Sequence, residues 1–267
     1  MYFLSVVLIG TIYPIFLDVL SSQKISVGPP FYHKLIIPFL IPFLLIMAIG
    51  PKLKWIKSNL EDKIYLIVLL IVSILLSILI VKNFSTDFLI NTILISSAFY
   101  LFFITLRDFF NKGFKNLAQN TAHFGFSLLI LSILFNNLFS TETITNLKVG
   151  ETFENTKTKI IFENINQKGE KNYQSIRAKF IIQDSKGKID NLSPELRIYN
   201  QPNIVTSEAD IKTTLLSDKF IVINLVPNQE LFNVRYQVKP FMLWIWISVI
   251  LISIGGLLSF AKKEYEK

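Results

Sequence analysis

Residues Ile64–Val81 read IYLIVLLIVSILLSILIV, and this stretch decides the fold class of the chain. It contains no formally charged residue, and Ser73 and Ser77 are its only small polar residues. A helix on the surface of a soluble protein would show a polar stripe along one side. About 20 apolar helical residues are needed to cross the hydrocarbon core of a bilayer. The stretch therefore predicts a transmembrane helix.

Five more apolar runs without formal charge accompany this stretch. With the first one included, the runs cover residues 2–17, 35–51, 64–81, 88–106, 116–141 and 240–261. The composition agrees, because 51% of the residues are hydrophobic and the mean hydropathy is +0.48. We expect a polytopic α-helical membrane protein with about six spans and one small external antiparallel β domain.

The β domain is expected at residues 142–238, which are rich in Lys, Glu, Asn, Asp and Thr. Four short alternating runs predict strands at 156–162, 175–182, 195–199 and 219–225, and residues 184–188 predict a turn. Such a pattern is typical of a small antiparallel sandwich or barrel. The expected domains are a membrane bundle of five helices at 1–141, the β-rich domain at 142–238, and a sixth membrane helix with a basic tail at 239–267.

The positive charges predict which side of the membrane each loop occupies. The formal net charge is +8, and basic residues gather in three short segments, 52–63, 107–115 and 262–267. Short basic loops stay in the cytoplasm, so we expect both termini there and residues 142–238 in the periplasm. Because the charges serve topology, they do not indicate nucleic-acid binding. The absence of cysteine excludes disulfides and thiolate metal ligands.

The candidate site residue is His123, an ionisable residue within the fifth span. Asn116, Asn120, His123 and Ser127 are spaced four, three and four residues apart, so they share one helix face. An ionisable group inside a span is costly and is by default a candidate for a functional site. The alternative is an interhelical hydrogen bond, since His, Asn and Ser also serve that purpose. The residues alone leave both interpretations open.

If His123 belongs to a site, the residue types favour haem over a metal held by several side chains. Asp18 is the only acidic residue expected near the end of a span, whereas haem needs only one or two axial ligands, usually imidazole. The other histidine, His33, is expected at the outer end of the second span, while His123 lies near the cytoplasmic side. The second axial ligand is therefore expected from another chain or from a part that this chain lacks.

Prolines and glycines in the spans predict helix packing. Pro14 in the first span, with Pro38 and Pro42 in the second, predicts that both helices pack in the interior of the bundle. The pair Gly255-Gly256 in the sixth span allows close contact between helices. Trp244 and Trp246 begin that span and are typical of the aromatic belt at a membrane surface.

Five short motifs stand out along the chain: GTIYP at 10–14, KISVGPPFY at 24–32, AHFG at 122–125, SEADI at 207–211 and KPFMLWIW at 239–246, the last followed by Gly255-Gly256. They resemble those of one known family, the CcmF-type haem lyases of cytochrome c maturation. Each motif is weak by itself, but together and in order they are similar to the C-terminal part of that family. The resemblance covers essentially the whole chain.

The resemblance implies inner-membrane machinery that receives haem from a periplasmic carrier and joins its vinyl groups to the cysteine thiols of apocytochrome c. In the family, two histidines hold an intramembrane b haem that is thought to reduce the substrate haem before attachment. His123 corresponds to one of these two ligands. The resemblance therefore implies haem b as the cofactor, with the haem carrier and apocytochrome c as partners.

This chain departs from the family pattern in the parts that it lacks. The family's Trp-rich external segment, its two flanking histidines and the other ligand of the b haem belong to the N-terminal part. We expect either a split-gene product completed by an N-terminal haem lyase portion or an incomplete copy, and Met1 just before the first span favours the former. Either form is expected to be inactive alone.

The alternative is a structural membrane subunit or a transporter, with His123 as interhelical glue or as a proton relay. Transporters usually show broken helices in two related halves. Here only the first two spans carry prolines in their interior, and no second half repeats them.

Overall fold

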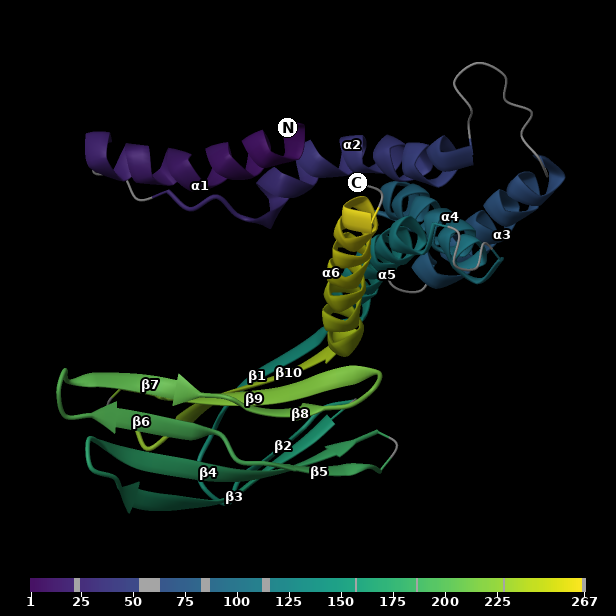
Figure 1. Cartoon of the computed structure of the whole chain (residues 1–267). Coiled ribbons are helices and arrows are strands. Elements are labelled where there is room, and N and C mark those ends of the chain that lie inside the picture. The colour runs from purple at the N-terminus through teal and green to yellow at the C-terminus, as the bar shows by residue number, and fades with distance from the viewer. Residues whose placement is uncertain are drawn as a thin grey trace. The chain divides into compact units, whose positions relative to one another are not determined.

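The computed structural model describes residues 1–21, 25–52, 63–82, 87–111, 116–156, 158–185, 187–227 and 229–265. Its long helices are α1 (Tyr2–Ser21), α2 (Pro29–Ile49), α3 (Lys63–Val81), α4 (Phe88–Asn111), α5 (Leu117–Phe139) and α6 (Met242–Tyr265), and a 3₁₀ turn, η1 (Gly50–Lys52), follows α2 (Figure 1). These six described helices are long and apolar enough to cross a membrane, as predicted.

The residue contacts divide the chain into two compact units. The membrane unit consists of Met1–Leu131 and Ser248–Lys267, and the sandwich unit consists of Ser132–Ile247. The predicted domain boundaries at 141/142 and 238/239 stay a prediction. Much of the basic loop expected at 52–63 and of the loop expected at 107–115 lies outside the described residues, as do the side chains of the basic tail.

Two helices differ from their predicted bounds for identifiable reasons. Helix α2 begins at Pro29, because proline lacks the N–H that the first helical turn leaves unpaired in any case. Residues 29–34 were expected in a loop and are helical instead. Helix α4 continues to Asn111, beyond the predicted end at residue 106, so that Asp108 lies within its last turn.

In the membrane unit, α4 is the best-buried helix. Of its most apolar window 56% is buried, against 11–22% in the other five helices. It packs mainly against α2 and α3. The serines of the opening stretch, Ser73 and Ser77, are fully buried, and their hydroxyls donate to the carbonyls of Leu69 and Ile74. These small, internally satisfied residues allow helices to approach closely.

Helices α1 and α2 both correct the expectation drawn from the prolines, since only 11% of the apolar window of each is buried. Helix α2 packs against α4, whereas the main contact of α1 is with α2. That contact joins two of the sequence motifs, because a Cβ atom at Gly10 would lie 2.6 Å from the Tyr32 hydroxyl. Tyr2 also donates to the Leu35 carbonyl at 3.0 Å. Within the described chain, α1 therefore lies against a single helix and not in the interior.

Among its described residues, the sandwich unit contains ten antiparallel strands in two sheets, which Figure 1 labels. The strands are β1 (Thr141–Leu147), β2 (Thr152–Glu154), β3 (Thr158–Gly169), β4 (Tyr173–Asp184), β5 (Ile189–Leu192), β6 (Glu195–Tyr199), β7 (Ile204–Glu208), β8 (Asp210–Thr213), β9 (Ser217–Leu225) and β10 (Phe232–Pro240). One sheet has the order β1-β10-β9-β8, and the other has the order β2-β3-β4-β6-β7 with β5 paired to β4.

The core of the sandwich unit is formed by the alternating apolar residues of the central strands. Phe162 and Phe180 stack with their ring centroids 4.4 Å apart, and Ile221 and Ile223 are fully buried in the same core. The predicted strands correspond to β3, β4, β6 and β9, and an antiparallel sandwich is confirmed. The predicted turn holds Gly187 at φ +78°, a conformation that glycine adopts readily.

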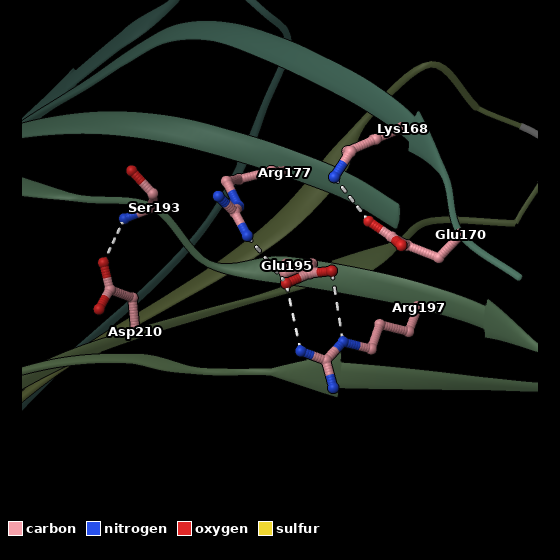
Figure 2. A network of polar contacts seen from close by, with 7 residues as sticks. All are labelled: Lys168, Glu170, Arg177, Ser193, Glu195, Arg197 and Asp210. Carbon is pink, nitrogen blue, oxygen red and sulfur yellow. Dashed lines mark hydrogen bonds and ion pairs between the residues drawn. The ribbon is translucent and has the colours of Figure 1, made fainter. Parts of the chain in front are cut away.

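Ion pairs connect the strands of the sandwich. Figure 2 shows the buried Glu195 carboxylate between Arg177 and Arg197, at 3.5 and 3.3 Å. Burial raises the pKa of Glu195, but hydrogen bonds from Ser175 and the two arginines outweigh it, so the net pKa is lowered. In the same view, Asp210 of the fourth motif accepts the Ser193 backbone N–H at 2.5 Å. This motif residue therefore has a structural role.

Candidate functional site

Three of the four polar residues predicted to share a face of α5 do line one cavity. Asn116, just before the helix, lies with Asn120 and His123 around a space of about 60 Å³. The remaining lining residues come from α2 to η1, from α4 and from the first turn of α5, and they are Met47, Ala48, Pro51, Ile104, Thr105, Asp108 and Gln119. The fourth residue, Ser127, instead makes a 2.7 Å hydrogen bond to the Thr105 hydroxyl.

Contacts with α4 determine which way α5 faces. The Asn120 side-chain amide donates to the Asp108 carbonyl at 3.2 Å, and the Ser127–Thr105 hydrogen bond lies two turns further along. Between them, the Phe124 ring stacks on Phe109 with centroids 5.3 Å apart. These contacts hold the helix in one rotation, so that the partly exposed His123 lies on the cavity side.

Asp108 is the site residue that the sequence reasoning missed. Its carboxylate lines the cavity and forms a 3.1 Å ion pair with Lys52, whose side chain and that of Asp108 are 17% and 16% exposed. The expectation that Asp18 is the only acid near a span end is therefore wrong. Lys52, counted among the loop charges, is paired with Asp108. The signal was present in Phe109 and Phe110, which continue the apolar pattern beyond Asp108.

Helix α6 contacts the other side of α5 through glycines. A Cβ atom at Gly255 would lie 2.7 Å from the Ala122 nitrogen, and a Cβ atom at Gly125 would lie 3.0 Å from the Ile252 nitrogen. The predicted close contact is thus confirmed for Gly255. The neighbouring Gly256 has nothing within 4 Å of its added Cβ atom.

The imidazole of His123 could supply one axial ligand of a haem, but the cavity beside it is too small to hold the haem itself. Binding sites for such ligands measure several hundred Å³, far more than the space beside His123. His33 lies about four helical turns before the α2 residues of the cavity, or about 20 Å along the axis. Among the residues that the structure describes, no three His, Cys, Asp or Glu side chains converge on one point. A haem would have to lie on the exposed side of His123.

Comparison with known proteins shows which proteins this chain is similar to. Residues 138–240 match the family model of the CcmF C-terminal β-sandwich. The cytochrome c-type biogenesis protein CcmF of Pseudomonas fluorescens is 27% identical over 98% of this chain, and CcmF of Escherichia coli K12 is 26% identical over the same share. The chain is similar to the C-terminal part of CcmF. It spans about 42% of the length of these two CcmF proteins.

A solved structure shares this fold. A solved structure of "Cytochrome c Heme Lyase CcmF" covers 96% of this chain with a TM-score of 0.69 at 19% identity, and 43% of that structure is matched. The resemblance to CcmF drawn from the five motifs is confirmed, and with its six apolar helices the chain is an integral membrane protein. The role of His123 stays a prediction.

Proposed function

We propose that the chain is the C-terminal portion of a cytochrome c haem lyase, the assembly that attaches haem covalently to apocytochrome c. The proposal is carried by a partly exposed histidine within an apolar span, His123, in a chain that is similar to CcmF along 98% of its length. Because the chain spans 42% of that relative, an N-terminal portion or subunit supplies the rest of the assembly. The chain alone is expected to be inactive.

Within the assembly, His123 supplies one axial ligand of an intramembrane b haem. Bound haem supplies one-electron redox chemistry. The residues of this chain hold the imidazole in place, because the contacts of Asn120 and Ser127 with α4 fix the rotation of α5. The second ligand comes from the N-terminal portion, since His33 is too far along α2 to reach the same iron.

The orientation follows from the basic loops. The chain lies in the inner membrane with both termini in the cytoplasm, and residues 142–238 lie in the periplasm. There the sandwich contacts the haem carrier or apocytochrome c. Deleting residues 142–238 should abolish co-purification of these partners with the assembly, and undiminished co-purification would contradict this role.

The axial-ligand proposal is tested by spectroscopy on the chain purified together with its N-terminal portion. The reduced-minus-oxidised spectrum should show a b-type signal that His123→Ala abolishes. The matched control is His33→Ala, which removes the other histidine and should leave the signal unchanged. A full b-type signal in the His123→Ala protein would overturn the proposal.

A second candidate function is favoured by the size and polarity of the cavity. A space of about 60 Å³ is large enough for water, and Asp108 and His123 both line it. In a transporter or structural subunit, this arrangement would serve as a proton relay or as a hydrogen-bonded helix contact. The same absorption spectrum separates the two functions, because neither a relay nor a helix contact absorbs visible light.

A further inference from the structure

The turn between β8 and β9 carries two leucines that serve neither the turn nor the core. Leu215 and Leu216 are 72% and 68% exposed, more than any other large apolar residue described in the sandwich unit. The turn is held by its flanking residues, because Thr214 and Ser217 exchange three hydrogen bonds of 2.7 to 3.1 Å. Tight turns usually carry Gly, Asn, Asp, Ser or Pro. Two leucines at this position therefore need another explanation.

Hydrogen bonds attach this turn to the beginning of α6. The Phe241 backbone N–H donates to the Leu216 carbonyl at 2.8 Å, and the Trp244 indole N–H donates to the Leu215 carbonyl at 2.9 Å. Phe241 adopts φ +61°, which is uncommon for an aromatic residue. In this conformation β10 passes into α6 without a linker (Figure 1). The turn and the start of the span are therefore held at the same level.

Because α6 begins to cross the membrane here, the turn that carries Leu215 and Leu216 is expected at the membrane surface. The helix is apolar from Met242 onwards, and tryptophan side chains prefer the boundary between headgroups and acyl chains. Trp244 lies in the first turn of the helix and binds Leu215, and Trp246, two residues later, is exposed. Exposed apolar side chains at this depth are removed from water by lipid. Lys239, which precedes the helix, has its amine 5.4 Å from the Phe220 ring centroid and adds a positive charge near the headgroups.

We propose that Leu215 and Leu216 form a membrane anchor, which inserts into the lipid surface around α6 on the side of the sandwich. The occupant is the acyl boundary of the bilayer. The anchor gives the sandwich a second attachment to the membrane surface, separate from its chain connections to α5 and α6. This role does not depend on haem or on the proposed lyase function.

The absence of cysteine allows a direct test on the full chain. Single variants Leu215→Cys and Leu216→Cys would each carry an environment-sensitive fluorophore in phosphatidylcholine vesicles containing brominated lipids. The matched control is Leu225→Cys, an exposed apolar position at the other end of β9, about 26 Å from the turn. We expect the lipid to quench the probes at 215 and 216 several-fold more strongly than the probe at 225.

Two results would overturn the anchor. Quenching at 215 and 216 no stronger than at 225 would show that the turn stays in water. Probes at 215 and 216 that are shielded both from brominated lipid and from aqueous iodide would show that protein covers the turn. In that case the surface is an interface with another polypeptide or a second copy.

Discussion

Gly255 of α6 lies against the backbone of Ala122, the residue that precedes His123. A Cβ atom at Gly255 would approach the Ala122 nitrogen to 2.7 Å and the Ala118 carbonyl oxygen to 2.9 Å. Because these atoms of α5 belong to its backbone, no rotation of a side chain can make room for the added Cβ atom. The contact therefore fixes the distance between α5 and α6 one residue away from the proposed ligand.

Gly255→Leu is expected to weaken haem binding by about tenfold, as mutations that displace a ligand's supports commonly do. The leucine would push α6 away from α5 and let α5 rotate, so that His123 leaves its position. The measurement is haem titration of the chain together with its N-terminal portion, followed by the b-type absorbance.

Gly256→Leu is the control for this variant, because a Cβ atom added at Gly256 has nothing within 4 Å. It should bind haem like the unaltered protein. If His123→Ala loses the haem while Gly255→Leu retains it, the glycine contact has no positioning role. If His123→Ala also retains the haem, the ligand assignment itself is wrong.

Asp108→Ala is expected to destabilise the membrane unit by about 1–3 kcal/mol, since it leaves the Lys52 ammonium without its carboxylate in a largely buried place. The measurement is unfolding in mixed micelles with increasing denaturing detergent. The double variant Lys52→Met/Asp108→Met removes both charges and should recover part of the loss. If the single and double variants lose equal stability, the ion pair does not join α4 to the residues after α2.

Asp190→Asn is expected to destabilise the sandwich unit by about 3–5 kcal/mol. Asp190 is 2% exposed and binds the amines of Lys219 and Lys212, both at 2.7 Å. Asparagine would leave the buried Lys219 charge unpaired. Hydrogen exchange of the full chain should then show faster exchange in β5, β8 and β9. Asp184→Asn, at the partly exposed end of β4, is the comparison and should change exchange little.

Acidification should weaken the same strands. Burial raises the pKa of Asp190, but hydrogen bonds from Lys212 and Lys219 outweigh it, so the folded-state pKa is lowered. A lowered pKa means that the carboxylate stabilises the fold above its unfolded value of about 4 and loses this contribution as the pH falls through the folded value. Hydrogen exchange in β5 and β9, corrected for intrinsic rates, should rise below about pH 4. The Asp190→Asn protein should lack this part of the pH dependence.

An element could be predicted from the sequence where its own residues show a clear local pattern of apolar and polar positions. The central strands β3, β4 and β9 bury one face, so alternation revealed them. The residues of β1, β7 and β8 are exposed or half-buried except for Leu147, and β10 continues directly into the sixth span. Their pairing depends on neighbours distant in the chain, and short windows contain little information about it.

The candidate site shows the same division. The spacing of Asn116, Asn120 and His123 on one helical face was predictable, because the period of an α-helix is local. That Asp108 and its partner Lys52 also lie at this site was not predictable. It depends on where α4 ends and on how α4 packs against its neighbours. The prolines did not predict the burial of α1 and α2 for a similar reason, since a proline affects its own helix but does not determine how many neighbours cover it.

The sequence by itself determined six membrane helices, an antiparallel domain and a histidine within the fifth span, because hydrophobic length and periodicity are properties of consecutive residues. Only the tertiary structure decided that Ser127 binds Thr105, that Asp108 pairs with Lys52 beside the cavity, and that Gly255 but not Gly256 touches α5. These outcomes depend on the rotation and separation of helices. Close packing sets both through atoms that lie far apart along the chain.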